Sequence, residues 1–438
     1  MIFQQVAPPA CEERKSNRIR RTINRCSGAV YAVLRQSRRT LKLAAQTITT
    51  LLLTAVVGFA QDAYVAARQK ALVLEQQRNF AGAETAWQSL SKTYPDNPEP
   101  YARCALLEAR QEHYKESVPL YRKAIALNPS VPGLRLNLAL ALFKSGQLKD
   151  AIPEFEALLA AAPPNSPDAQ RFTILLGMAH YGLAEYDKAA PFLKQAADQD
   201  QQSLPLRLAL AHSYLWTRQF PKVMDVYKEI LALNPDSAEA DMIAGEALDE
   251  LKDNEGSTKM FRAAVKANPK EPNVHFGLGY LLWTQKQYPE AASEFQAELT
   301  NDPRHAQSML YLGDTYLQLN RPEEARPLLS QALRLDSTLW LGDLDLGIVD
   351  SDAGRNDDAL RELEAAESLK ADDVNVHWRL ARLYRTLGRK EEAKAEFDKA
   401  SKLNKATDDD LFKKMNNGQQ RPGAPQTEPQ PSTSPNPN

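Results

Sequence analysis

The sequence predicts an all-α protein, an α-solenoid built from tandem helix–turn–helix repeats. The main observation is a pattern that recurs with a period of about 34 residues over most of the 438-residue chain. Each period contains two amphipathic stretches of about a dozen residues, joined by a polar turn such as residues 144–150 or 353–358. A small residue in one stretch and a large one in the other return at fixed places, as closely packed pairs of helices require.

The segment at 1–60 differs from the remainder of the chain. Residues 1–42 contain ten Lys or Arg against two Glu, and an apolar run occupies 43–60. A basic segment, an apolar segment and small residues such as Ala60 at its end are typical of a secretory signal peptide. We expect cleavage after Ala60 and export to the periplasm or the cell exterior. The alternative is an inner-membrane anchor at 43–60, because this run is close to the shortest length that spans a bilayer.

Three repeats follow in one register over residues 64–165. Their marks include Ala71, Ala83, Trp87, Ala105, Tyr121, Ala124, Ala139, Ala151 and Phe155. Cys104, next to one of these marks, is expected to be a small buried apolar residue rather than part of a disulfide framework. A fourth repeat, at 166–203, is displaced by four residues. We expect residues 163–170 to absorb that displacement as a longer loop, because they contain three Pro.

Six more repeats occupy residues 204–407 without a change of register. Their marks include Tyr214, Tyr227, Gly245, Phe261, Gly279, Phe295, Gly313, Gly347, Ala393 and Phe397. The Pro that closes most repeats is missing at four junctions, where we expect more continuous helix because Pro interrupts helices. These junctions are at Gln201, Ser337, Ala371 and Lys405.

Two short segments follow the repeats. Thr407 and the three Asp residues after it predict a helix start, because a hydroxyl caps the helix and acids stabilise its positive end. We expect a capping helix at 408–417 that covers the last repeat. Residues 418–438 contain six Pro and no large apolar residue, which predicts a disordered tail.

This pattern resembles the tetratricopeptide repeat family, and about ten repeats over 64–407 carry the resemblance. The resemblance implies a right-handed superhelix in which the first helix of each repeat lines a concave groove for a protein or peptide partner. The implied groove positions are Phe143, Met178, Tyr181, His212, Leu215, Trp216, Met242, Phe276, Tyr280, Trp283, Leu310 and Tyr311. Acidic side chains share this surface at Glu246, Asp249, Glu250, Asp314, Asp345 and Asp352, and Arg379, Arg382 and Arg385 lie near its C-terminal end.

Packing between repeats is the alternative explanation for several groove residues. It is as good an explanation as exposure for Phe276 and Leu310, whereas we expect Trp216 and Trp283 to be exposed. The three arginines could meet an acidic partner or pair with Glu391 and Glu392. The family's site for acidic C-terminal peptides needs Lys and Asn at positions that are aliphatic, aromatic or acidic here. The groove therefore favours a partner segment with apolar anchors and some basic residues.

Motifs for catalysis, phosphate binding and metal binding are absent from the sequence, including GxSxG, GxxxxGK[ST], HExxH and CxxC. The six histidines are widely spaced along the chain, although His275 and His377 share a repeat position. A net charge of −2 gives no reason to expect nucleic-acid binding. We therefore expect no cofactor, no metal and no enzymatic activity.

The leading hypothesis is an exported bacterial scaffold that holds a partner protein, in envelope assembly or secretion. One alternative is a membrane-anchored adaptor with the same solenoid, held through residues 43–60. Another is the regulatory subunit of an enzyme complex.

Overall fold

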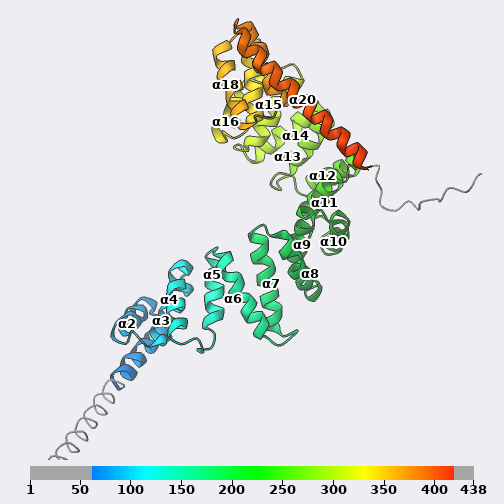
Figure 1. Cartoon of the computed structure of the whole chain (residues 1–438). Helices are drawn as coiled ribbons and strands as arrows, with labels where there is room; N and C mark the ends of the chain where they lie inside the picture. The colour runs from blue at the N-terminus through cyan, green and yellow to red at the C-terminus, as the bar shows by residue number, and fades with distance from the viewer. Residues whose placement is uncertain (1–61, 419–438) are drawn as a thin grey trace, which may run out of the picture. The chain divides into compact units, whose positions relative to one another are not determined.

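The computed structural model describes residues 62–418, and every regular element in that range is a helix (Figure 1). A helical segment at 62–76 comes first. It is followed by α2 Phe80–Thr93, α3 Pro98–Arg110, α4 Tyr114–Leu127, α5 Leu134–Lys144, α6 Leu148–Ala161, α7 Pro167–Gly182, α8 Tyr186–Gln199, α9 Leu204–Trp216, α10 Phe220–Leu233, α11 Ala238–Glu250, α12 Asn254–Ala267, α13 Val274–Thr284, α14 Tyr288–Asn301, α15 Ala306–Gln318, α16 Pro322–Leu335, α17 Trp340–Asp352, α18 Asn356–Leu369, α19 Val374–Thr386 and α20 Lys390–Gly418. Within the described range these elements form ten helix–turn–helix pairs, which confirms the predicted fold class.

The chain divides into two compact units, Met1–Phe172 and Thr173–Asn438. The boundary lies within α7, and the pairs from α9 onward belong wholly to the second unit. Residues 1–60, with the expected signal peptide or anchor, lie outside the described residues, as does nearly all of the expected tail at 418–438. Among the helices of residues 62–418, none combines the length and the apolar character needed to cross a membrane.

The turn inside each pair has a recurring backbone conformation. One residue with positive φ occupies it in all ten pairs: Arg78, Glu112, Gly146, Ala184, Arg218, Lys252, Lys286, Asn320, Gly354 and Gly388. Successive members are one repeat period apart, except that the interval from Gly146 to Ala184 is longer by the displacement of the fourth repeat. Only three of the ten are glycine, the residue that adopts this conformation without strain. The turn is therefore set by the packing of the helices rather than by glycine alone.

The displacement of the fourth repeat lengthens a helix, and the prediction of a longer loop is wrong. The connection between α6 and α7 is only 162–166, whereas α7 has 16 residues against 13 in α9. Ser166 and Pro167 explain this early start. The Ser166 hydroxyl accepts from the amide of Ala169 at 3.2 Å, and Pro is favoured in the first turn because its missing N–H has no partner there.

Glycine and a large ring alternate where neighbouring helices pack in the second unit. The ring of Phe261, on α12, is buried between Gly245 of its own pair and Gly277 of the next. A Cβ atom at Gly245 would lie 2.6 Å from this ring, and one at Gly277 would lie 2.3 Å from it. Both distances are far below carbon–carbon contact, so only glycine fits against this ring.

The first unit has its own core, in which Trp87 is fully buried and donates its indole N–H to Glu75 at 2.6 Å. Cys104 belongs to the same core as a free, buried thiol. Burial is the main cause that raises the pKa of this thiol to about 12. Cys104 therefore acts as the small apolar residue that the sequence predicted.

The last helix corrects the prediction of a separate cap. α20 continues from Lys390 to Gly418, so Thr407 lies inside a helix instead of capping a new one at 408–417. Lys405 replaces the usual Pro and leaves the backbone N–H that helix continuation needs.

At the other three junctions without Pro the expectation of continuous helix is wrong, because the chain breaks between the helices. Acidic side chains bond the backbone near two of these breaks. Asp336 accepts from the amide of Thr338 at 2.9 Å, and Asp373 caps α19 by accepting from the amide of Asn375 at 2.9 Å. Such side-chain bonds offer the backbone an alternative to helix.

Candidate partner-binding groove

The first helices of three consecutive pairs, α9, α11 and α13, surround one cavity in the second unit. Neighbours in this series contact each other directly. The cavity has a volume of about 600 Å³. Its lining consists of Leu215, Trp216, Arg218, Phe220, Met242, Glu246, Asp249, Glu250, Phe261, Asn273, Phe276, Gly277, Tyr280, Leu281 and Gln307. We call this the groove cavity.

Two aromatic side chains on this lining are open to solvent. Trp216, the last residue of α9, is 63% exposed, as the sequence predicted. Its indole stacks on Tyr186, with ring centroids 5.8 Å apart and planes 12° apart, so one face of the ring is held in place. Tyr280 on α13 is 36% exposed. An exposed Trp and Tyr in a concave surface are typical anchors for a partner.

The remaining wall of the groove cavity is acidic. Glu246, Asp249 and Glu250 all come from α11. Glu250 pairs at 2.9 Å with Arg218, the only cationic side chain in the lining. Glu246 is open to solvent, yet the surrounding atoms desolvate its carboxyl group and raise its pKa. A cationic group that entered the cavity would relieve this cost.

Trp283 lies beside the cavity, but its side chain is less exposed to solvent than expected. It is half-buried, and its indole N–H donates to the buried carboxylate of Asp314 on α15. Its ring packs edge-on against Tyr311, with centroids 5.1 Å apart, and stacks on Tyr280 at 5.9 Å. Leu310 is buried, so packing between repeats is the correct explanation for it. Of the predicted groove residues, Leu215, Trp216, Met242, Glu246, Asp249, Glu250, Phe276 and Tyr280 line the cavity.

Other predicted groove residues lie elsewhere. Phe143 belongs to the first unit, where its ring packs edge-on against Phe155 at 6.1 Å. Met178 and Tyr181 are partly buried against the core formed by α8 to α11. The hydroxyl of Tyr181 is 3.1 Å from Nδ1 of His212, so this pair is joined across two repeats.

The three arginines lie on α19, near the C-terminal end of the second unit. Arg382 and Arg385 are exposed, whereas Arg379 is half-buried. Within residues 62–405, whose side chains are described, no ion pair joins them to Glu391 or Glu392. Glu392 pairs instead with Arg389 at 3.0 Å.

Trp378, on the same helix, was missed by sequence reasoning although it is 47% exposed. Its place in the repeat could have revealed it, because it lies three periods after Phe276, a predicted groove residue.

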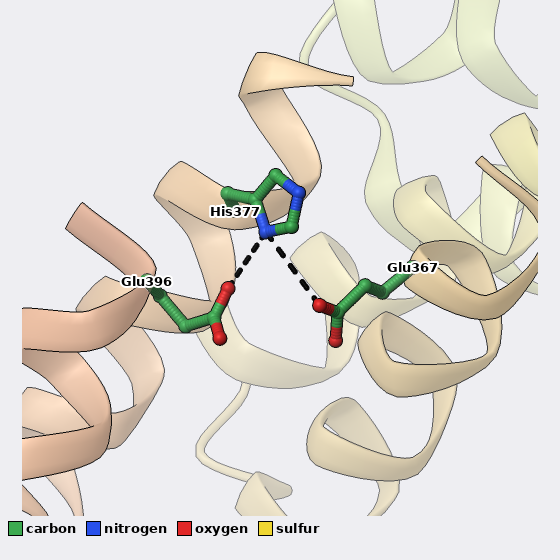
Figure 2. Close-up of side chains that lie close together, drawn as sticks. All are labelled: Glu367, His377 and Glu396. Atoms are coloured by element: carbon green, nitrogen blue, oxygen red, sulfur yellow. Dashed lines mark hydrogen bonds and ion pairs between the residues drawn. The ribbon is translucent and has the colours of Figure 1, made fainter. Parts of the chain in front are cut away.

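A second cluster has side chains that metal ions use as ligands. Figure 2 shows Glu367, His377 and Glu396 turned toward one another from three helices, α18, α19 and α20. Nδ1 of His377 is 2.6 Å from Glu396 and 3.8 Å from Glu367, while Nε2 donates to the carbonyl of Ala371 at 2.9 Å. A backbone carbonyl on the second ring nitrogen is also common for histidines that bind zinc.

Two observations nevertheless favour an ion-pair cluster. The ammonium group of Lys399 lies 2.7 Å from Glu367 and 2.8 Å from Glu396, so a cation already bridges both carboxylates. The same kind of pair recurs three repeats earlier, where Nδ1 of His275 lies 2.6 Å from Glu294. The cluster is therefore better explained as an ion-pair network that joins α18, α19 and α20 than as a metal centre.

Comparisons with known proteins agree with the fold. Two family models described as "Tetratricopeptide repeat" match the chain, one at 68–132, 104–166, 136–203, 253–304 and 276–339, the other at 182–247 and 351–412. Together these matches cover well over half of the chain.

Curated relatives and solved structures were also found. DnaJ homolog subfamily C member 7 homolog of Schizosaccharomyces pombe is 24% identical, over 63% of this chain and 64% of its own length. TPR repeat-containing protein YpiA of Bacillus subtilis is 23% identical, over 51% of this chain and 53% of its own. The chain thus spans less than two thirds of these relatives. The structure of YrrB, titled a TPR protein with an unusual peptide-binding site, is 19% identical with a TM-score of 0.36, over 40% of this chain and 91% of its own.

Proposed function

The chain belongs to the tetratricopeptide repeat family, and we propose that it is a non-catalytic scaffold that holds a segment of a partner protein in the groove cavity. The observation that carries this proposal is the exposed ring of Trp216, which Tyr186 stacks in place at the edge of a concave surface. Large aromatic side chains that stay exposed on the lining of a cavity often mark an interaction site, and Trp and Tyr dominate the binding energy of many interfaces.

The chemistry of the lining supports binding over catalysis. Its side chains are carboxylates, amides, apolar groups, aromatic rings and one guanidinium, and the lining contains no Ser, Cys, Lys or His. It therefore lacks the nucleophile and the imidazole base that acyl or phosphoryl transfer commonly uses. Its two exposed rings and unpaired acids suit a segment with an apolar anchor and a basic residue.

The experiment that tests this proposal places a photo-crosslinking amino acid at Trp216 in the full-length chain, expressed in its host. Trp87, fully buried in the first unit, and Lys228, exposed on the second helix α10, are the control positions. A discrete adduct at 216 that is absent at 87 and 228 supports groove binding. Equal labelling at 216 and 228, or no adduct from a folded and correctly located protein, refutes it.

We further propose that the scaffold acts outside the cytoplasm, in envelope assembly or secretion. Support comes from the basic segment at 1–42 and the apolar run at 43–60. Sequencing the N-terminus of the mature protein tests this. A start at Gln61 supports export with cleavage, and retention of 43–60 in a membrane fraction supports the anchored adaptor. An uncleaved protein in the cytosol contradicts both.

A further inference from the structure

The groove cavity is one end of a longer surface. In the second unit the first helices α9, α11, α13, α15, α17 and α19 contact one another in this order. We call this series the inner layer. A segment bound in the groove cavity can therefore continue along the same layer toward α19.

The charge of the inner layer changes sign between its ends. At α11, Glu246 and Asp249 line the groove cavity and make no ion pair among the described residues. At α19, the corresponding positions hold Arg382 and Arg385, both exposed. Arg382 lies four periods after Glu246, and Arg385 lies four periods after Asp249. The same two places in the repeat are thus acidic at one end and cationic at the other.

The cationic end also has an exposed aromatic ring. Trp378 lies one helical turn before Arg382, on the same face of α19. Its ring packs edge-on against Phe397 at 5.4 Å, and the guanidinium of Arg385 lies 6.0 Å from the centre of the Phe397 ring. These contacts order Trp378 and Arg385 while leaving both exposed.

Several acidic groups around α19 already have partners. Glu367 and Glu396 are held by Lys399 and His377, and Glu392 is held by Arg389. Among the described side chains, Arg382 has no ion pair at all. The two exposed guanidiniums are therefore free to bind an anionic group from outside the chain.

Two of the predicted acids between the two ends are withdrawn from the surface. Asp314 on α15 is buried and accepts from Trp283 and Gln318. Asp345 on α17 is only 4% exposed. A third predicted acid, Asp352 at the last position of α17, is exposed. The acidic side chains at α11 and the arginines at α19 still give the two ends opposite charge.

We propose that the partner segment is bipolar, with a basic group that enters the groove cavity at Glu246 and Asp249 and an acidic group that binds Arg382 and Arg385 beside Trp378. This inference rests on the proposed function, since it names the chemistry of the segment that the groove holds. Opposite charges at two separated points fix which end of the segment lies at which end of the layer.

The length of such a segment follows from the helix spacing. Four steps separate α11 from α19 along the inner layer, and packed helices lie about 8–10 Å apart, which gives roughly 32–40 Å. An extended chain covers about 3.3–3.6 Å per residue, so about 10–12 residues are needed to reach both ends. A segment of half that length reaches only one.

The test is selection from a display library of random peptides of about 16 residues, long enough to span both ends, on the full-length protein. Wild type is compared with a Glu246→Lys/Asp249→Lys variant and with an Arg382→Glu/Arg385→Glu variant. An Arg304→Glu/Arg334→Glu variant is the matched control for the arginine variant, because it makes the same charge change at exposed residues outside the inner layer. Circular dichroism melts confirm that each variant is folded.

The expected result is that wild type and the control enrich peptides with a basic cluster and an acidic cluster about 10–12 residues apart. The first variant should lose only the basic preference, and the second should lose only the acidic preference. Enriched peptides without a charge pattern, or a pattern that neither variant changes, overturn the bipolar inference but leave groove binding intact. If no peptide is enriched on the inner layer at all, the proposed function fails as well.

Discussion

Replacing Gly279 by Leu tests the packing of the repeats most sharply. Gly279 lies in α13 and faces Phe295 of α14, whose side chain is fully buried. A Cβ atom at this position would lie 2.8 Å from Cε1 and 2.9 Å from Cδ1 of that ring. Carbon atoms pack at about 3.5–4.0 Å, so the first added atom is already about 0.7–1.2 Å too close, and three more carbons follow it.

Two effects of opposite sign decide how much Gly279→Leu changes the free energy of unfolding. Overpacking a filled core costs about 1–3 kcal/mol, because the ring and the backbone must shift. Leu is a better helix former than Gly and offsets this by nearly 1 kcal/mol. We expect a net loss of about 1–2 kcal/mol, since the ring of Phe295 is fully buried and packs against Phe276 and Tyr311 on its other sides.

The assay is urea unfolding followed by circular dichroism, with the midpoint and slope compared with wild type. Ser293→Leu is the control, because it places the same side chain on the exposed face of α14 and should change stability by no more than about 0.5 kcal/mol. A midpoint for Gly279→Leu that equals or exceeds wild type would refute the packing argument, because helix propensity alone predicts a gain.

A double-mutant cycle identifies the partner in that contact. Phe295→Ala alone should lose about 3–5 kcal/mol through the cavity it leaves. Combined with Gly279→Leu the loss should be smaller than the sum by about 0.5–3 kcal/mol, because the leucine fills part of that cavity. Additive losses would show that the two residues do not meet.

Two further predictions concern charged groups in the last repeats. Burial is the main cause that raises the pKa of Glu362 from 4.5 to about 7, so folding favours the protonated carboxyl group. The stability that this protonation contributes is complete below about pH 4.5 and is lost as the pH rises through 7. Glu362→Gln should therefore be more stable than wild type at pH 8, on the order of 1–3 kcal/mol, and equal to it at pH 4.5; a pH-independent difference in urea midpoints would contradict this. In the ion-pair cluster, His377→Ala should cost about 1.5–3 kcal/mol, because it removes the hydrogen bond to the buried Glu396 and leaves Lys399 as the remaining partner of that carboxylate. Neither EDTA nor Zn²⁺ should move the wild-type Tm by more than the buffer control does, and a rise with Zn²⁺ would show that the cluster is a metal site after all.

Much of the fold could be predicted because it depends on a local period. The spacing of Gly245, Gly279 and the large residues opposite them depends only on contacts inside one pair or with the next, and these contacts recur once in every repeat. The family resemblance implied that Glu246 and Tyr280 share one groove, and both line the groove cavity. Exceptions to the period were harder to predict. The extra turn of α7 depends on capping by Ser166, and α20 continues past Lys405, where six other repeats have Pro.

The solvent exposure of individual side chains was the least predictable property, because it depends on residues one repeat away. Trp283 and Trp216 looked alike in sequence. Trp283 is half-buried because Asp314, on the first helix of the next repeat, accepts its indole N–H, whereas Trp216 remains open beside Tyr186. The cluster around His377 joins three helices and could not be read from spacing along the chain.

The central claim is that the groove cavity of the second unit is the binding surface, and the affinity of one library-selected peptide for a Trp216→Ala/Tyr280→Ala variant tests it most directly. Truncating an interface anchor costs about 2 kcal/mol or more, so affinity should fall at least about 30-fold. Leu335→Ala, at an exposed apolar residue on α16, should leave affinity unchanged. Wild-type affinity in the double variant, with loss in Leu335→Ala, would place binding on another face and contradict the account.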